Sequence, residues 1–194
     1  MTEREIAWEI EKEMSILCAE SLSFDTIVAS GLNGSKPHHS PTNKQISNGE
    51  AITIDMGAKL NGYCSDLTRT IFIGKPDEKF KKIYNIVLRS QLISIETAKD
   101  GMTGEEIDKI SRDIISEEGF GEFFGHSLGH GVGLEIHENP GVGPNSKNEI
   151  IPGMVYTIEP GIYIDGWGGI RIEDMVLMTD NGNKLLSHAE KGSY

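Results

Sequence analysis

Carboxylates lie in several stretches of this chain that read as β-strands, where an ionised side chain is unfavourable. Asp55 follows the run Ile52–Ile54, and burying its charge there is costly unless something compensates it. Four more residues of metal-ligand type come later, and three of the four adjoin apolar or β-branched residues. Together the five are Asp55, Asp66, His130, Glu159 and Glu173. One such residue could be an accident, whereas five indicate a site for two divalent cations.

The types of these residues narrow the choice of metal. Four carboxylates and one imidazole form a hard, oxygen-rich set, which favours Mn²⁺, with Co²⁺ or Fe²⁺ as alternatives. A structural zinc site would contain more cysteine and histidine, and Zn²⁺ stays among the alternatives only as a further option. Each acid alone would be read as an ordinary turn or exposed strand residue. The paired pattern is what favours a metal site.

A first β-hairpin, about residues 50–73, would bring two of the acids together. Asn61-Gly62 is the strongest short signal for a hairpin turn. With this turn Asp55 faces Thr68, and Asp55 and Asp66 become diagonal neighbours on one face. Diagonal cross-strand residues are within reach of each other, and two converging carboxylates can hold metals about 3.5–4 Å apart.

A second hairpin, about residues 153–178, would contribute the other two acids. A loop centred on Gly166 places Glu159 directly opposite Glu173. Pro160 interrupts the strand, so the register depends on how the chain passes this residue.

Three of the six histidines lie within twelve residues, in a glycine-rich segment. They are His126, His130 and His137. The spacing of the first two mimics a helical metal pair, but the glycines at 125, 129, 131 and 133 favour extended chain close to a ligand. His38, which precedes His39 in a loop, is a weaker signal.

The same segment matches a short hydrolase motif. Gly125–Gly129 has the form G-x-S-x-G, with Ser127 as the nucleophile and His188 later in the chain. This elbow requires a core strand before it and a helix after it. Because the preceding segment is short and the following one is glycine-rich, we favour the metal site.

Two capping boxes mark the starts of similar helices. Thr2–Glu5 and Thr103–Glu106 both have the required form, and Gly119 is a C-cap for the second helix. The apolar face of the first helix consists of Ile6, Ile10, Met14 and Leu17. Each helix precedes one of the hairpins, which indicates a diverged internal repeat. We therefore expect an α+β domain whose two halves face each other, each giving half of the site.

The two halves of this repeat are unequal. An amphipathic helix over about Asp77–Lys99 precedes the second capping box, whereas nothing precedes Thr2. We expect that residues 1–194 are one catalytic domain that begins one helix short. We also expect that the uncovered apolar surface is buried in a homo-oligomer, a dimer, or belongs to a longer protein.

Composition excludes several classes of partner. Asp and Glu outnumber Lys and Arg 30 to 18, a net charge of −12, which argues against binding nucleic acid or anionic membranes. No apolar stretch is long enough to span a membrane, and the polar, acidic start is unlike a signal peptide. Cys18 and Cys64 have no pairing pattern, which indicates reduced thiols in the cytoplasm.

A set of motifs in fixed order makes the chain resemble a known family. The motifs are SFDTIVASG, PHH, ITIDMGA, GYCSDLTRT, GHSLGHGVGLEIHENP, PGMVYTIEPGIYI and GGIRIEDM. Together they resemble the pita-bread metallopeptidases, and within them the Xaa-Pro aminopeptidases and Xaa-Pro dipeptidases (prolidases). The resemblance covers nearly the whole chain and implies the pita-bread fold, with helices packed on a curved antiparallel sheet.

The resemblance also implies a role for each metal ligand. Asp66 and Glu173 would bridge both metals. Asp55 would complete the ligands of one metal, and His130 with Glu159 those of the other.

On the substrate side, the resemblance implies that His38 and His137 contact the substrate or the tetrahedral intermediate. We expect His126 in the same substrate-binding region. Glu159 would carry a proton to the leaving nitrogen, and His137 would stabilise the oxyanion. Arg171 is expected both near the substrate and as a partner that orients a metal-binding carboxylate.

The expected reaction is hydrolysis of the first peptide bond of peptides with proline in second position. Many family members have an arginine after the His-Glu-x-Pro segment where this chain has Gly141, which weakens the dipeptidase interpretation. The alternatives are a methionine aminopeptidase, a creatinase-like hydrolase, and a peptide-binding protein without activity. The last would be expected to lose ligands, and this chain keeps all five.

Overall fold

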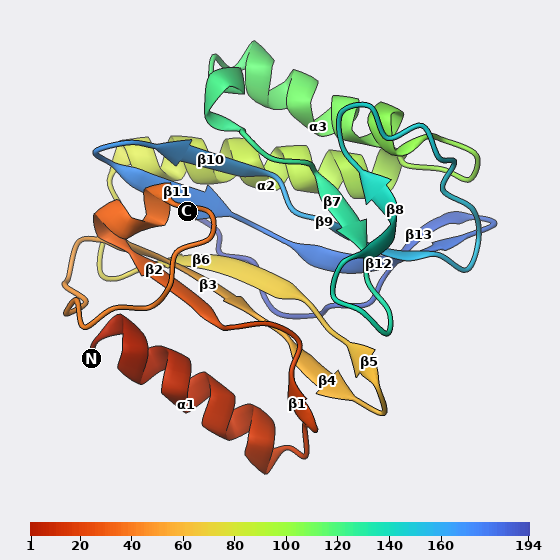
Figure 1. Cartoon of the computed structure of the whole chain (residues 1–194). Coiled ribbons are helices and arrows are strands. Elements are labelled where there is room, and N and C mark those ends of the chain that lie inside the picture. The colour runs from red at the N-terminus through yellow and green to blue at the C-terminus, as the bar shows by residue number, and fades with distance from the viewer.

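Three long helices flank a set of antiparallel strands in the computed structural model, which describes residues 1–194 (Figure 1). The helices, with two short 3-10 turns, are α1 (Glu3–Ile16), α2 (Glu78–Thr97), α3 (Gly104–Glu117), η1 (Gly31–Ser35) and η2 (Gly121–Phe123). The strands are β1 (Ser21–Leu22), β2 (Ile27–Ser30), β3 (Ala51–Met56), β4 (Ala58–Leu60), β5 (Tyr63–Cys64), β6 (Leu67–Phe72), β7 (Gly129–Gly131), β8 (Glu138–Val142), β9 (Val155–Ile158), β10 (Gly161–Ile164), β11 (Gly168–Arg171), β12 (Asp174–Thr179) and β13 (Gly182–Leu185).

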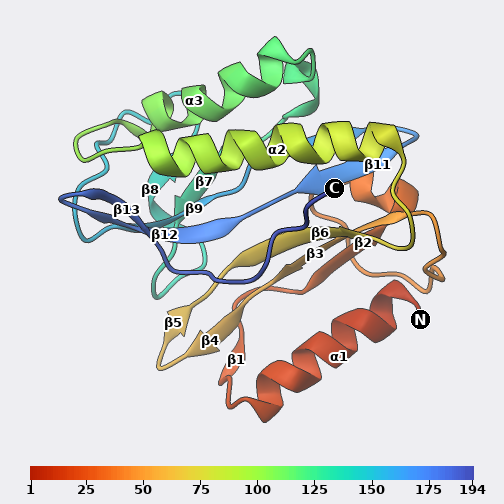
Figure 2. The ribbon, with the colours of Figure 1, turned by 180° about the vertical axis from the view of Figure 1, so that it is seen from behind.

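The strands form a layer between the helices. In both ribbon views α2 and α3 lie on one side of the strands and α1 lies on the other (Figures 1 and 2). A sheet of order β2-β3-β6 belongs to the first half, and a larger one of order β13-β12-β9-β7-β8 belongs to the second. The expected α+β architecture is therefore present.

The two halves begin in the same way, as the repeat predicts. Both capping boxes form, and each capping threonine also makes an isolated antiparallel bridge, Thr2 with Gln45 and Thr103 with Glu149. Such boxes satisfy backbone N–H groups that the helix itself leaves without partners. The pseudo-symmetry thus extends from the sequence pattern to the hydrogen bonds.

The main hydrophobic core lies between α2, α3 and the second half of the sheet. Phe80, Ile83 and Val87 on α2 are fully or almost fully buried in a cluster of 19 buried residues. A smaller cluster of Ala7, Val28 and Ile52 fixes α1 to β2 and β3. Helices α1 and α2 therefore pack against strands that carry candidate ligands.

One detail of the predicted first helix is wrong. Ile6, Ile10 and Met14 are half-buried, but Leu17 is 77% exposed. The helix ends at Ile16, so Leu17 is its C-cap and no longer follows the helical face.

None of the helices combines the length and the apolar character that crossing a membrane requires.

Candidate metal centre

The first hairpin forms with the predicted turn and register. Asn61 and Gly62 both have positive φ, 51° and 79°, as a tight hairpin turn requires. Asp55 on β3 pairs with Thr68 on β6, and Asp66 directly precedes β6. The turn chemistry therefore sets which face of the sheet these two acids occupy.

The second hairpin keeps its register across the interruption at Pro160. Ile158 pairs with Asp174 on one side of the break, and Gly161 pairs with Arg171 on the other. The same register places Glu159 opposite Glu173, as predicted. Neither acid lies in a named strand, so the break frees both side chains to face the first hairpin.

His130 lies on the short strand β7, not on a helix. Its backbone N–H donates to Thr157 Oγ1 at 3.1 Å, and the same hydroxyl donates to Glu159 Oε1 at 3.2 Å. A Cβ on the preceding Gly129 would collide with the carbonyl of Thr157. The glycine therefore lets the backbone of β7 approach β9 closely enough to bring the imidazole to the acids.

One cavity of about 590 Å³ collects the predicted residues, and its size is typical of a ligand pocket. All nine residues singled out in the sequence line it: His38, Asp55, Asp66, His126, His130, His137, Glu159, Arg171 and Glu173. They come from both halves of the fold.

The imidazole of His130 lies among the acids. Its Nε2 atom is 3.4 Å from Glu159 Oε1 and 3.6 Å from Asp66 Oδ2. Ligand atoms of Asp66, His130 and Glu173 all lie within 4.8 Å of one another, so these three side chains could hold a cation. Asp55 and Glu159 lie outside this group of three.

Burial makes the acids unfavourable as bare charges. Burial, together with repulsion from Asp55 and Glu159, raises the pKa of Asp66 to about 8. Burial and neighbouring acids raise the pKa of Glu173 well above its usual value. Burial also raises the pKa of Asp55, although Arg171 opposes it. Divalent cations would supply the missing compensation, so the donor set fits a metal centre.

The pKa values of His130 and Glu159 are shifted in opposite directions. Burial lowers the pKa of His130, but contact with Glu159 outweighs it and raises the pKa overall. Burial raises the pKa of Glu159, but His130, His126 and Arg171 outweigh it and lower the pKa overall. Glu159 is therefore the acid of the cluster that most readily stays ionised.

Only one of the two carboxylate oxygens of Asp55 has a hydrogen-bond partner. Arg171 Nη2 donates to its Oδ2 atom at 2.6 Å, while its Oδ1 atom is buried without a hydrogen-bond partner. A buried carboxylate oxygen without a partner is costly, and coordination of a cation would satisfy it.

The sequence interpretation missed Tyr163 on β10. Its hydroxyl lies 2.9 Å from Arg171 Nη1 and 2.9 Å from His126 Nε2, so it joins these two predicted residues. In sequence it reads only as one more strand residue in an apolar run. Arg171 also donates to Thr68 Oγ1 and to the carbonyl of Pro37, which leaves its guanidinium occupied by protein partners.

The surroundings of Ser127 do not form a nucleophile elbow. Residues 124–128 precede the strand β7, and no helix follows them. The G-x-S-x-G match thus lacks the strand–turn–helix context that the motif needs.

The comparisons with known proteins agree with this geometry. The model of metallopeptidase family M24 matches residues 1–180. The chain belongs to metallopeptidase family M24. Membership of this family implies divalent metal ions, in agreement with the group formed by Asp66, His130 and Glu173.

Several M24 proteins are similar over almost all of this chain. The Xaa-Pro dipeptidase of Pyrococcus horikoshii is 51% identical over 189 residues, which are 97% of this chain and 54% of that protein. The solved Xaa-Pro dipeptidase from Bacillus anthracis superposes with a TM-score of 0.97 at 50% identity, covering 99% of this chain and 54% of that one. For the X-Pro aminopeptidase from Thermotoga maritima the TM-score is 0.97 at 43% identity, covering 99% and 55%.

These likenesses confirm the expected pita-bread fold of the M24 family. The chain spans about half the length of the relatives it matches.

Proposed function

We propose that this M24 chain hydrolyses the N-terminal peptide bond of peptides with proline in second position. The observation that carries the proposal is the buried cluster of acids around His130, which opens into a cavity lined by His38, His126 and His137. Relatives about half identical to the chain are Xaa-Pro dipeptidases, which supports this substrate class.

The proposed metal ligands are those that the cavity brings together. Asp55, Asp66, His130, Glu159 and Glu173 would hold two divalent cations. Divalent cations in this position polarise a carbonyl and lower the pKa of water, which is the chemistry that amide hydrolysis needs. The oxygen-rich donor set favours Mn²⁺ among the candidates.

His137 is proposed to stabilise the oxyanion that develops on the scissile carbonyl. Its ring centroid lies 4.1 Å from that of His130, so it is adjacent to the proposed ligands. Burial and the neighbouring His130 lower the pKa of His137, which keeps the ring neutral near pH 7. A neutral imidazole N–H can donate to the oxyanion without adding charge to the ground state.

Glu159 is proposed to move the proton. Its lowered pKa leaves a carboxylate that can accept a proton from the attacking water and release it to the leaving imino nitrogen. His38 and His126 would contact the substrate. Arg171 would orient Asp55, a role that its occupied donors support better than direct contact with a peptide.

A peptide library tests the proposal. The chain is incubated with added Mn²⁺, Co²⁺ or Zn²⁺, and each released N-terminal residue is identified. Cleavage before proline in second position supports the proposal. Comparing the cleavage rates of dipeptides and of longer peptides distinguishes a dipeptidase from an aminopeptidase. Release of N-terminal methionine irrespective of proline, or no cleavage with any of these metals, would refute it.

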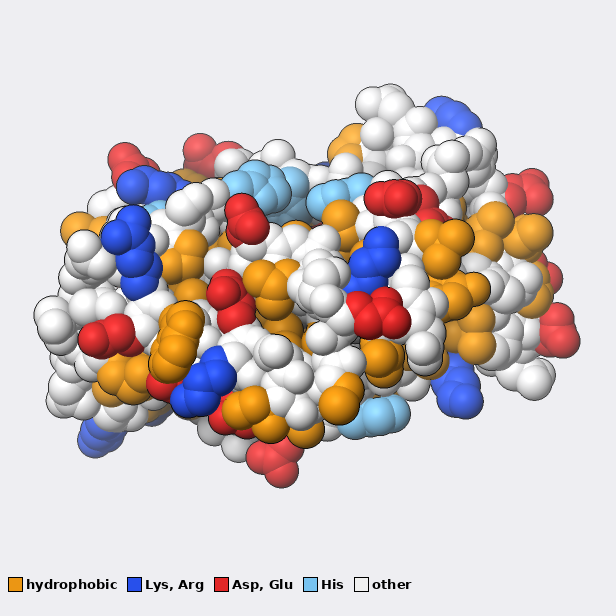
Figure 3. Space-filling model, turned by 60° about the horizontal axis from the view of Figure 1, so that its bottom comes forward, with side chains coloured by type: hydrophobic (Ala, Val, Ile, Leu, Met, Phe, Trp, Pro, Cys, Tyr) orange, Lys and Arg blue, Asp and Glu red, His pale blue; other side chains and the backbone are white.

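We also propose that the chain forms a dimer in the cytoplasm. Trp8, Ile16 and Leu17 of the α1 region are exposed apolar residues, which supports association. On one face of the molecule acidic, basic and hydrophobic side chains are interspersed, with histidine side chains at its upper edge and also at its lower edge (Figure 3). Sedimentation equilibrium measures the mass directly, and a monomer at micromolar concentration would contradict the proposal.

A further inference from the structure

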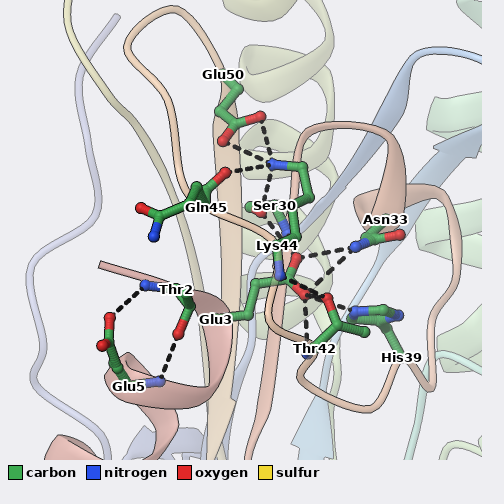
Figure 4. Close-up of polar contacts among 10 residues, drawn as sticks. All are labelled: Thr2, Glu3, Glu5, Ser30, Asn33, His39, Thr42, Lys44, Gln45 and Glu50. Atoms are coloured by element: carbon green, nitrogen blue, oxygen red, sulfur yellow. Dashed lines mark hydrogen bonds and ion pairs between the residues drawn. The ribbon is translucent and has the colours of Figure 1, made fainter.

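Glu3, at the start of α1, is a fully buried acid outside the metal centre. Its relative exposure is 0%, and six donor groups converge on its two carboxylate oxygens (Figure 4). Ser30 N and Oγ donate to Oε1, both at 2.8 Å. On Oε2, Thr42 N and Oγ1 donate at 3.1 and 2.7 Å, and His39 Nε2 lies at 3.0 Å. Asn33 Nδ2 reaches both oxygens.

These donors belong to the two ends of one loop. Ser30 and Asn33 lie where the loop over residues 31–42 leaves β2, and His39 and Thr42 lie where it ends. The carboxylate of Glu3 therefore joins the two ends of the loop through hydrogen bonds, as Figure 4 shows. Lys44 Nζ donates to Ser30 Oγ at 2.9 Å, which leaves the Ser30 hydroxyl proton to point at Glu3.

His38 lies on the part of this loop that faces the cavity. Both His38 and the adjacent His39 line the cavity, but His38 is exposed, whereas His39 is 8% exposed and also contacts Glu3. On the other side of His38, the carbonyl of Pro37 accepts from Arg171 Nη1 at 3.2 Å. Both neighbours of His38 in the chain are thus fixed, and His38 itself is left free to meet a ligand.

The chemistry of the contact requires a carboxylate. Burial raises the pKa of Glu3, but hydrogen bonds from Thr42, His39, Asn33 and Ser30 outweigh it and lower the pKa to about 2. Glu3 is therefore an anion at any working pH and can only accept. Because every partner is a donor, a glutamine amide in its place would turn an N–H toward the backbone N–H of Ser30 or Thr42.

The second half contains a comparable device. Asp108, buried on α3, accepts from the backbone N–H of Leu128 at 3.0 Å and pairs with Arg112. Arg112 in turn donates to the carbonyls of Phe124 and His126, both at 2.8 Å. In each half, then, a buried acid on the helix fixes a segment that brings a histidine to the cavity.

We propose that Glu3 is a positioning residue for substrate, which acts by holding the loop over residues 31–42 so that His38 faces the metal centre. The inference rests on the proposed function for its kinetic consequence, but the position of His38 is independent of activity. Glu3 itself touches neither the cavity nor any proposed ligand.

The experiment compares Glu3→Gln with Glu5→Gln in the whole chain. Glu5 is on the same helix but only completes the capping box with Thr2, a role that glutamine also fills. The imidazole Cε1–H signal of His38 in the NMR spectrum is assigned by its loss in His38→Ala. It should shift or broaden in Glu3→Gln and stay unchanged in Glu5→Gln. An unchanged His38 signal in folded Glu3→Gln would overturn the inference, whether or not the chain is active.

Kinetics then test the consequence with a double-mutant cycle. Glu3→Gln should lower kcat/KM for an Xaa-Pro peptide about 10-fold, and should have little further effect when His38 is already alanine. Bound metal should stay at the wild-type amount. Additive effects of the two changes would refute action through His38, whereas no turnover by the wild type would refute the proposed function instead.

A milder variant covers the case in which Glu3→Gln does not fold. Thr42→Val keeps the shape of the side chain but removes one of the six donors. It should move the His38 signal in the same direction by a smaller amount, and no movement in this variant would overturn the inference.

Discussion

Arg171 Nη2 lies 2.6 Å from Asp55 Oδ2, and this ion pair joins β11 of the second half of the fold to β3 of the first. The same guanidinium donates to Thr68, Tyr163 and the carbonyl of Pro37. The buried side chain of Arg171 therefore contacts the proposed metal ligand Asp55, Tyr163, which in turn contacts His126, and the loop that carries His38.

The first prediction concerns this ion pair. Arg171→Lys should weaken Mn²⁺ binding about 10- to 100-fold, because an ammonium group cannot reach four acceptors and leaves Asp55 poorly oriented. Isothermal titration calorimetry measures the Kd. Arg89→Lys, at an exposed position paired with Glu118, is the matched control. Equal affinities in the two variants would show that Arg171 does not support the site.

The second prediction concerns His137. Replacing it with alanine should lower kcat by about 10²–10³, because one donor to the oxyanion is lost. Metal content should not change, since His137 is not among the proposed ligands. The control is His188→Ala, an exposed residue outside the cavity. Loss of metal, or full activity, in His137→Ala would place this residue in a different role.

The third prediction concerns metal removal. Chelator should lower the melting temperature, and saturating Mn²⁺ should restore it by about 5–10 °C, because the ion binds only the folded chain. Asp66→Asn should melt higher than the wild type in chelator, because the buried Asp66, with its raised pKa, must take up a proton on folding and asparagine need not. The variant should gain nothing from Mn²⁺. A melting temperature that changes with neither chelator nor Mn²⁺ would contradict a buried acid cluster.

The fourth prediction concerns pH and Glu3. Its folded-state pKa is lowered from the usual 4.5 to about 2, so it stabilises the fold above pH 4.5 and loses that effect as the pH falls toward 2. The difference in unfolding free energy between wild type and Glu3→Gln should shrink from pH 6 to pH 3. Urea titrations in chelator measure it. A difference that stays constant over this range would mean that Glu3 is not an ionised, hydrogen-bonded acid.

Local signals in the sequence were sufficient to predict the fold class and the convergence of the candidate ligands. Asn61-Gly62 specifies its turn through backbone conformation, so the pairing of Asp55 with Thr68 could be counted from it. The register of Glu159 and Glu173 also followed from the loop at Gly166, because the break at Pro160 neither adds nor removes a residue from the count.

Contacts between distant segments could not be predicted in the same way. A glutamate in the first turn of a helix is ordinarily an exposed residue near the positive end of the helix, and Glu3 gives no sign of its burial. Its partners lie 27 to 39 residues away and come together only in the fold. Tyr163 is similar, because its partner His126 lies 37 residues away in the sequence and meets it only in the fold.

A metal titration coupled to turnover tests whether the acid cluster around His130 binds two cations that hydrolysis requires. The chain is freed of metal with chelator, returned to known amounts of Mn²⁺, and assayed for bound metal and for release of the first residue from an Xaa-Pro tripeptide. We expect two ions per chain, activity that requires them, and loss of both metal and activity in Asp66→Ala and Glu173→Ala. Full turnover in chelator, or two ions retained in either variant, would contradict it.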